Sequence, residues 1–208
     1  MLQTKAVERH TFGLLEELMG IDFLDDFSLV GGTALALRLG HRKSIDIDLF
    51  NTAKFNVAIL KDKISRKLGE RASFHSSEKN KLGVFGYFEG VKIDLCKHPY
   101  PLLKPVEVFS GIRIWSLEDI AASKVYAIAA RATKKDFWDI DILLDHFTME
   151  QIAGFYDKRY KQVLAISVAK MLTYFDEANN SDTPACLHGK TWTQIKKSIS
   201  RKINQQTK

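Results

Sequence analysis

Cysteine is scarce in this chain of 208 residues, which contains only Cys96 and Cys186. The two lie far apart in the sequence, without the spacing of a zinc-binding motif. Small secreted domains are dense in disulfides, whereas cytosolic proteins keep their thiols reduced. The sequence therefore predicts two reduced thiols, no disulfide and a cytoplasmic protein.

Long apolar runs are also absent. No segment reaches the roughly 18 consecutive apolar residues that a membrane-spanning helix requires. The first ten residues, MLQTKAVERH, lack the basic-then-apolar order of a signal peptide. The Lys-Ser/Thr ending of a P-loop is missing too, which argues against a P-loop ATPase. We expect no membrane partner.

Acidic residues are missing from the end of the chain. No Asp or Glu follows Asp182, whereas six basic residues lie between Lys190 and Lys208. These six account for the net charge of +6, because residues 1–189 hold 25 charges of each sign. A polyanion such as RNA would meet the protein mainly at this tail. The alternative is a solvated basic helix end that binds nothing specific.

The chain changes pattern at about residue 115. Before this point helices alternate with short strands: helices are expected over 5–19, 33–39 and 57–68, and strands over 28–30, 45–50 and four segments between 71 and 115. Afterwards the pattern is helical, with helices expected over 116–130, 134–146, from Thr148 onward, 165–175 and 192–203. We predict an α+β fold with two domains: residues 1–115 form a mixed β-sheet core with flanking helices, and residues 116–208 a helical domain with a basic tail.

Two carboxylates, Asp46 and Asp48, lie in an otherwise apolar strand. They alternate with Ile45, Ile47 and Leu49. Because successive strand side chains point to opposite faces, both acids are expected on one face and the three aliphatic side chains on the core face.

A third acid, Asp94, alternates in the same way in the segment VKIDLC. Adjacent carboxylates repel and are costly to bury unless a cation joins them. Three carboxylates on neighbouring strands could hold two Mg²⁺ ions about 3.5–4 Å apart, as in two-metal phosphoryl transfer. The alternative for a lone Asp-x-Asp pair is a solvent-facing strand.

Two further groups of residues fit phosphate chemistry. Gly31, Gly32 and Thr33 lie at a strand-to-helix junction, where glycine allows close approach and free N–H groups attract anions. The alternative is a plain tight turn. Downstream, cations and acids share one helical stretch, KVYAIAARATKKDFWDIDILL. Its cations could neutralise a triphosphate, or they could form weak ion pairs on a solvated face.

With these pieces in this order, the chain resembles the AbiEii/MenT family of nucleotidyltransferase-like toxins, in the DNA polymerase beta superfamily. The likeness rests on GGTALALRLGHRKSIDIDLF, on VKIDLC and on the pattern K-x-x-A-x-x-x-R-x-x-x-K-D-F-W-D. It spans about residues 28–145. The resemblance implies a nucleotidyltransferase core followed by a helical domain, with the active site between them.

The resemblance also implies an activity: Mg²⁺-dependent transfer of a nucleoside monophosphate from an NTP to RNA. In characterised members the acceptor is the 3′ end of tRNA, and a cognate antitoxin protein counteracts the toxin. The implied metal ligands are Asp46, Asp48 and Asp94, with Asp94 acting on the acceptor hydroxyl. Lys124 and Asp136 would complete the catalytic set. The implied nucleotide-binding residues are Gly31, Gly32, Thr33, Arg42, Ser44, Lys135 and Asp139.

Some features depart from this pattern or leave alternatives open. Thr33 stands where the superfamily usually has Ser, and the chain is shorter than many family members. His41 is expected to be a solvated loop residue, and Trp115, Trp138 and Trp192 to be packed in the interior rather than stacked on bases. The other functions to weigh are nucleotidyl transfer to a protein or small molecule, a metal-dependent glycosyltransferase, and a catalytically silent binding module.

Overall fold

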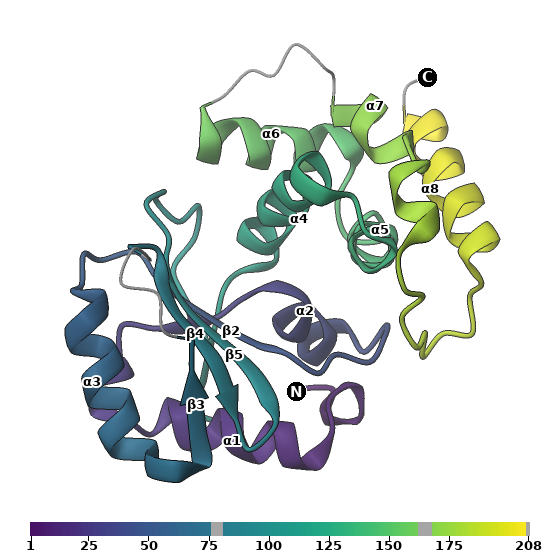
Figure 1. Ribbon diagram of the computed structural model, residues 1–208. Helices are drawn as coiled ribbons and strands as arrows, with labels where there is room; N and C mark the ends of the chain where they lie inside the picture. The colour runs from purple at the N-terminus through teal and green to yellow at the C-terminus, as the bar shows by residue number, and fades with distance from the viewer. Residues whose placement is uncertain (76–80, 162–167, 207–208) are drawn as a thin grey trace.

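The computed structural model describes residues 1–75, 81–161 and 168–206. A β-sheet flanked by helices forms one part of the molecule, and the remaining helices gather beside it (Figure 1). The strands are β1 (Ser28–Leu29), β2 (Ile47–Asn51), β3 (Ala72–Phe74), β4 (Gly83–Phe88), β5 (Val91–Lys97), β6 (Glu107–Phe109) and β7 (Ile112–Ile114). The helices are α1 (Arg9–Met19), α2 (Gly31–Leu39), α3 (Val57–Leu68), α4 (Leu117–Arg131), α5 (Lys134–Leu143), α6 (Met149–Tyr160), α7 (Val168–Thr173) and α8 (Trp192–Gln206).

The sheet is mixed, as the sequence predicts. Its strand order is β3-β4-β5-β2-β1-β7-β6, and the pairs β2–β5 and β1–β7 are parallel. Helix α3 covers one side of the sheet, while α2 lies on the other side, toward α4 and α5 (Figure 1). The α+β fold class is confirmed. The division into domains at residue 115 stays a prediction.

Local signals in the sequence explain several element ends. Asn56 caps α3 by accepting hydrogen bonds from the N–H groups of Ala58 and Ile59. Thr148 and Gln151 form the expected capping box of α6. The β4–β5 hairpin turns at Glu89 and Gly90, where both residues have a positive φ, as a tight two-residue turn requires.

The expected strand over 45–50 is wrong at its start. β2 begins at Ile47, and the Ile45 side chain is 62% exposed instead of facing the core. The reason is that the chain before β2 follows another path: the N–H of Ser44 donates to the carbonyl of Ala6, outside the sheet. The alternation of faces therefore holds only from Ile47 onward.

The helical predictions hold with adjusted limits. The helix expected over 134–146 ends at Leu143, and α7 is described over Val168–Thr173. Residues 165–167 of the helix expected there lie outside the described residues, as do Ser76 in the third-strand segment and Lys208 at the end of the tail. None of the helices in the described ranges combines the length and apolar character that crossing a bilayer requires.

The three tryptophans lie where helices pack. Trp115 and Trp138 are buried, and Trp192 stacks on Trp138 at a ring distance of 5.6 Å. Phe137 and Phe175 complete this aromatic cluster, which joins α5 to α8. The expectation of packing rather than base stacking is confirmed.

A buried polar cluster connects α6 to the sheet and to α4. Arg159 on α6 donates from Nη1 to Asp119 at 2.9 Å and from Nη2 to Nε2 of His98 at 2.7 Å. The guanidinium lies 4.2 Å above the Trp115 ring. Because His98 accepts at Nε2 in a buried place, its imidazole is neutral; burial and the charge of Arg159 lower the pKa of His98 to about 3.

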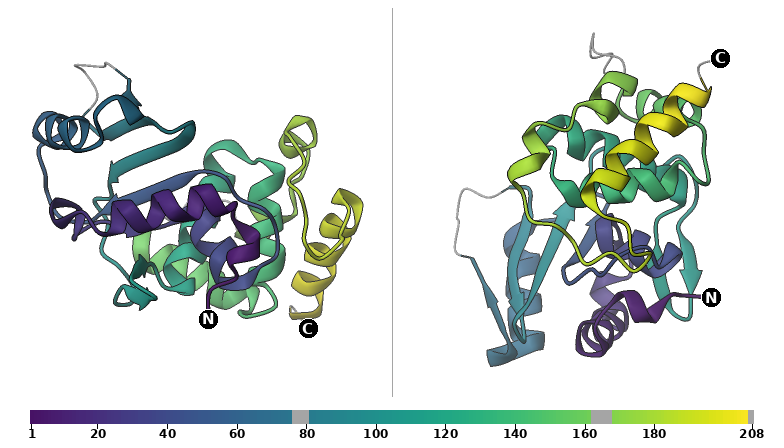
Figure 2. Two further views of the ribbon diagram at one scale, coloured as in Figure 1. Left: turned by 90° about the horizontal axis from the view of Figure 1, so that it is seen from below. Right: turned by 90° about the vertical axis from the view of Figure 1, so that its right-hand side faces the viewer.

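The segment between α7 and α8 returns to the core (Figure 2), where it contacts the loop that follows α2. Arg42 and Cys186 form an isolated antiparallel bridge. The N–H of Lys43 donates to Ala185 at 2.8 Å, and the N–H of Leu187 donates to His41 at 2.9 Å. Residues close to the C-terminal helix are thereby placed next to the loop that precedes β2.

Candidate active site

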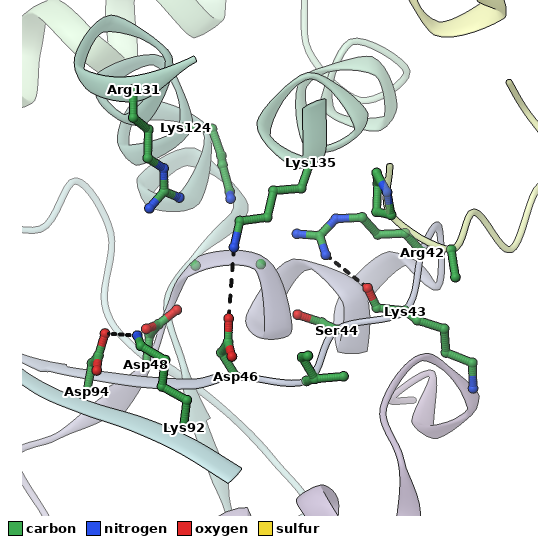
Figure 3. A pocket seen from close by; sticks show the side chains of 15 residues that line it. Arg42, Lys43, Ser44, Asp46, Asp48, Lys92, Asp94, Lys124, Arg131 and Lys135 are labelled. Atoms are coloured by element: carbon green, nitrogen blue, oxygen red, sulfur yellow. Dashed lines mark hydrogen bonds and ion pairs between the residues drawn. The ribbon is translucent and has the colours of Figure 1, made fainter. Parts of the chain in front are cut away.

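A polar pocket of about 380 Å³ lies where the sheet, the start of α2 and the helices α4 and α5 meet (Figure 3). Acids from β2, β5 and the residue before β2 form one wall, and basic side chains face them from the helices and from the loop before β2. The lining residues are Gly31, Gly32, Arg42, Lys43, Ser44, Ile45, Asp46, Asp48, Lys92, Asp94, Lys124, Arg131, Lys135, Pro184 and Ala185.

The parallel register of β2 and β5 brings two acids together. Asp48 pairs with Asp94 across the two strands, and both line the pocket. Burial and the charge of Asp94 raise the pKa of Asp48, with a smaller contribution from Asp46. The three carboxylates predicted from the sequence therefore line the same pocket.

Asp94 has two different environments at its two oxygens. Oδ2 accepts a hydrogen bond from the ammonium of Lys92, two residues earlier on the same strand. Oδ1 is buried and has no hydrogen-bond partner among the described residues. Cys96 follows on the same face of β5, and burial together with Asp94 raises the pKa of its thiol to about 12, so the thiol stays protonated at neutral pH.

The acids fit a divalent cation in their chemistry. Carboxylate oxygens are the ligands that Mg²⁺ prefers, and Asp94 has a buried oxygen without a hydrogen-bond partner in the part of the chain that the structure describes. Burial and the neighbouring charge of Asp94 raise the pKa of Asp48, and a bound cation would offset both effects. Within the described ranges no three His, Cys, Asp or Glu side chains are gathered as closely as a finished metal site requires. The Lys92 ammonium lies among them instead.

Neighbouring side chains leave no room for a Cβ atom at Gly31 or Gly32. Gly31 has φ +70°, and a Cβ there would lie 2.8 Å from Oδ2 of Asp48. A Cβ on Gly32 would lie 2.2 Å from Nη2 of Arg42. The N-cap residue of α2, Val30, offers no side-chain hydrogen bond, so the first N–H groups of the helix stay open to an anion.

Thr33 lies behind the pocket and does not line it. Its side chain is buried, and its hydroxyl donates to the carbonyl oxygen of Asp46 and lies 2.8 Å from Oγ of Ser44. The role implied by the resemblance, lining a triphosphate, does not match this position. Thr33 instead fixes the segment that carries Ser44 and Asp46.

Asp139 is likewise fully buried and holds three cationic or polar groups. It accepts hydrogen bonds from Arg42 at 2.6 and 2.9 Å and from Nε2 of His41 at 2.7 Å, and it lies 2.5 Å from the Lys124 ammonium. Burial alone would raise the pKa of Asp139, but the charges of Arg42 and Lys124 hold it well below its usual range. Asp139 therefore positions these cations and does not face the pocket.

The expectation that His41 is solvated is wrong. Its ring is 2% exposed because it is drawn into the interior by the Asp139 carboxylate. Burial lowers the pKa of His41, more than the hydrogen bond with Asp139 raises it, so the ring is neutral at pH 7.

Asp136, like Asp139, lies behind the pocket and holds basic side chains in place. It is fully buried and accepts from Lys124 at 3.1 Å, from Arg131 at 3.2 Å and from Thr133 at 2.6 Å. Burial opposes its ionisation, but Lys124 and Arg131 lower its pKa to about 2. Asp136 and Asp139 lie one turn apart on α5. Both form ion pairs with Lys124, so the ammonium of Lys124 is fixed at the pocket wall.

Most of the residues singled out from the sequence meet in this one pocket. Nine of the twelve line it, and Thr33, Asp136 and Asp139 support the lining from behind. Lys135 lies 3.9 Å from Asp46 at the rim. Sequence reasoning assigned no role to Lys92, Lys43 or Pro184; the alternation of faces along β5 was a usable signal for Lys92, whereas nothing local marks Pro184.

Comparisons with known proteins identify the family of the chain. Residues 13–201 match the family model described as the AbiEii nucleotidyl transferase toxin of type IV toxin–antitoxin systems. An uncharacterized protein from Aquifex aeolicus (strain VF5) is 30% identical over 200 residues, which cover 92% of this chain and 93% of that protein.

Two solved structures share the fold. MenT4, a nucleotidyltransferase toxin from Mycobacterium tuberculosis H37Rv, superposes with a TM-score of 0.62 at 12% identity, covering 94% of this chain and 84% of MenT4. A candidate nucleotidyltransferase from H. pylori superposes with a TM-score of 0.60 at 17% identity, covering 95% of each chain.

Proposed function

Because the chain belongs to the AbiEii family of nucleotidyl transferase toxins, we propose that it transfers a nucleoside monophosphate from an NTP to an RNA acceptor, the 3′ end of tRNA. The proposed reaction depends on Mg²⁺ and takes place in the cytoplasm, where an antitoxin protein opposes it. The observation that carries the proposal is the pocket itself, in which three carboxylates and several basic side chains line one cavity at the start of a helix.

The reaction assigned to this pocket is one displacement at phosphorus. The oxygen of the acceptor hydroxyl bonds to the α-phosphorus of the NTP, the bond from that phosphorus to the bridging oxygen breaks, and pyrophosphate leaves. Mg²⁺ held by Asp46, Asp48 and Asp94 would lower the pKa of the attacking hydroxyl and balance the charge of the leaving group. Asp94, with a buried oxygen that no described residue hydrogen-bonds, is the proposed acceptor of the hydroxyl proton.

The cations opposite the acids are the proposed triphosphate ligands. Lys124 is buried and held by two aspartates, so little reorganisation is needed when charge moves onto the leaving group. Arg42 is fixed by Asp139 in the same way, and the open N–H groups of α2 lie beside it. Lys135, Arg131 and Ser44 complete this side of the pocket.

The cations at the rim of the pocket support a polyanionic acceptor. Arg42, Lys124 and Arg131 pair with the buried carboxylates of Asp136 and Asp139, and the Lys43 ammonium donates to the carbonyl of Lys5. Lys92 and Lys135 have half-exposed side chains next to the proposed metal ligands. An NTP bound with two Mg²⁺ ions is close to neutral, so these two positive charges stay available to RNA phosphates and disfavour a cationic small molecule.

The basic tail contributes less free charge than the sequence suggested. Lys190, just before α8, and Lys202, near the end of α8, form ion pairs with Asp141 at 2.6 and 3.0 Å, and Lys202 also pairs with Asp145. Lys197 and Arg201 remain exposed on α8. The proposed RNA contact therefore starts at the rim of the pocket and uses the tail as a secondary surface.

The experiment is incubation of the protein with Mg²⁺, total RNA and each radiolabelled NTP in turn. We expect label in the tRNA fraction with at least one NTP, and no label with Asp48→Ala even though thermal unfolding shows that this variant is folded. Labelling that survives Asp48→Ala would refute the assigned site. Label that enters protein instead of RNA would refute the acceptor but keep the reaction class. Calorimetry that detects neither NTP nor Mg²⁺ binding would favour a silent module.

A further inference from the structure

Among the described residues, Lys92 is the one basic side chain that a strand of the sheet contributes to the lining of the pocket. It lies on β5 two residues before Asp94, so both side chains leave the same face of the strand. Figure 3 shows the Lys92 ammonium pointing at Asp94 beside Asp48. Arg42, Lys124 and Arg131 are held by buried aspartates on α5, whereas Lys92 pairs with Asp94, one of the proposed metal ligands.

The register explains why a lysine at this position meets all three acids. Ile47 pairs with Ile93 and Asp48 with Asp94, so Asp46 and Lys92 both lie one residue before the first pair. Asp48, Asp94 and Lys92 therefore leave one face of the sheet, and Asp46, which lies just before the paired part of β2, lines the same pocket beside them (Figure 3). Burial opposes the charge on Lys92, but Asp94, Asp48 and Asp46 together raise the pKa of its ammonium.

We propose that Lys92 is the resident counter-ion of the carboxylate cluster in the metal-free protein, and that a divalent cation binds by displacing its ammonium from Asp94. This rests on the proposed function only in taking the three aspartates as the metal ligands. The Lys92 side chain is 45% exposed, so it has room to move away on its flexible stem. Once displaced, its charge lies at the mouth of the pocket, where phosphate groups of the NTP or of the acceptor can use it.

The proposal predicts the sign of the change in metal affinity when Lys92 is removed, and a lysine with only a structural role would not give that sign. A positive charge next to a cation site opposes binding, so its removal strengthens binding of the metal alone. For charges a few ångströms apart at a partly exposed site, the interaction corresponds to about a tenfold change in affinity. If Lys92 served instead to orient Asp94 as a ligand, its removal would weaken metal binding.

The test is titration of the nucleotide-free protein with Mn²⁺, followed by the electron paramagnetic resonance of the free ion. We expect Lys92→Met to bind Mn²⁺ about ten times more tightly than wild type, and Lys92→Arg, which keeps the charge, to stay within about twofold. Lys97→Met is the matched control: it removes a lysine from the same strand, but this side chain packs over Phe55 outside the pocket. Its affinity should equal that of wild type.

Equal or weaker Mn²⁺ binding by Lys92→Met would overturn the proposal, as would a failure of all variants to bind. If Lys92→Met does not fold, Lys92→Gln takes its place with the same expectation. The result is separable from the proposed function. RNA labelling by wild type without the predicted order of Mn²⁺ affinities refutes the counter-ion alone, and the predicted order without RNA labelling refutes the activity alone.

Discussion

Asp139 offers the sharpest test of how the two parts of the pocket are held together. Replacing it with Asn keeps the shape of the side chain but removes the charge that binds Arg42, Lys124 and His41. Arg42 and Lys124 are almost entirely buried and would keep their positive charges without their main anionic partner. The change in the free energy of unfolding of this variant therefore measures how much the fold depends on this buried carboxylate.

The expected loss is large. Breaking a buried ion pair by removing one partner costs about 3–5 kcal/mol, because an uncompensated charge stays in the interior. For a chain of this size each kcal/mol shifts the unfolding midpoint by about 2–4 °C, so we expect a decrease of about 6–20 °C. Asp145→Asn is the matched control: Asp145 lies just after α5 and pairs with Lys202, but its side chain is 45% exposed. Its loss should cost less than about 1 kcal/mol.

The dependence on pH has a definite sign. The pKa of Asp139 is well below its usual range in the folded protein. Its stabilising contribution is therefore complete above the unfolded pKa of about 4 and is lost as the pH falls toward the folded value. Chemical denaturation at several pH values should show a constant difference between wild type and Asp139→Asn from about pH 5 to 8, and a smaller difference below about pH 4. A variant within about 1 kcal/mol of wild type at pH 7 would refute the ion-pair argument.

The remaining predictions concern three other contacts. Gly32→Ala would place a Cβ 2.2 Å from Nη2 of Arg42, so we expect loss of RNA labelling, whereas Gly13→Ala, with nothing within 4 Å, should keep full activity. His98 is neutral in the fold with a pKa of about 3, so stability should fall as the pH drops below its unfolded value of about 6.5, and thermal scans of His98→Gln should show a shallower decline. Arg159→Met leaves Asp119 buried without its guanidinium, and we expect a loss of about 3–5 kcal/mol in denaturant unfolding; a loss below about 1 kcal/mol would contradict it.

The sequence predicted side-chain positions best where the two-residue period of a strand alone determines which face a side chain occupies. Alternation along VKIDLC correctly placed Asp94 and Lys92 on one face, because β5 is a regular strand with a partner on each side. The same rule failed at Ile45, where the chain before Ile47 leaves the sheet to pair near Ala6. Side chains alternate between the two faces only within the paired part of a strand. Where that pairing ends depends on contacts with distant residues.

The buried residues behind the pocket, His41, Asp136 and Asp139, could not be placed from the sequence in this way. His41 and Asp139 are separated by 98 positions, and nothing near either residue indicates that they are in contact. A mixed-charge helix usually lies on the surface, yet Asp136 and Asp139 are fully buried because Lys124, Arg131 and Arg42 neutralise them. Their burial depends on how α2, α4 and α5 pack, which the spacing of charges does not determine.

This arrangement makes the pocket a product of both parts of the chain. The sheet contributes the three acids, but the cations opposite them are held by aspartates on α5. Arg42 belongs to the core in sequence, yet its guanidinium is fixed by Asp139 from the helical part. Any movement of α5 away from the sheet would therefore release Lys124 and Arg42 from their aspartate partners together. The triphosphate side of the pocket should form or be lost as a unit, while the acids on β2 and β5 stay in place beside Lys92.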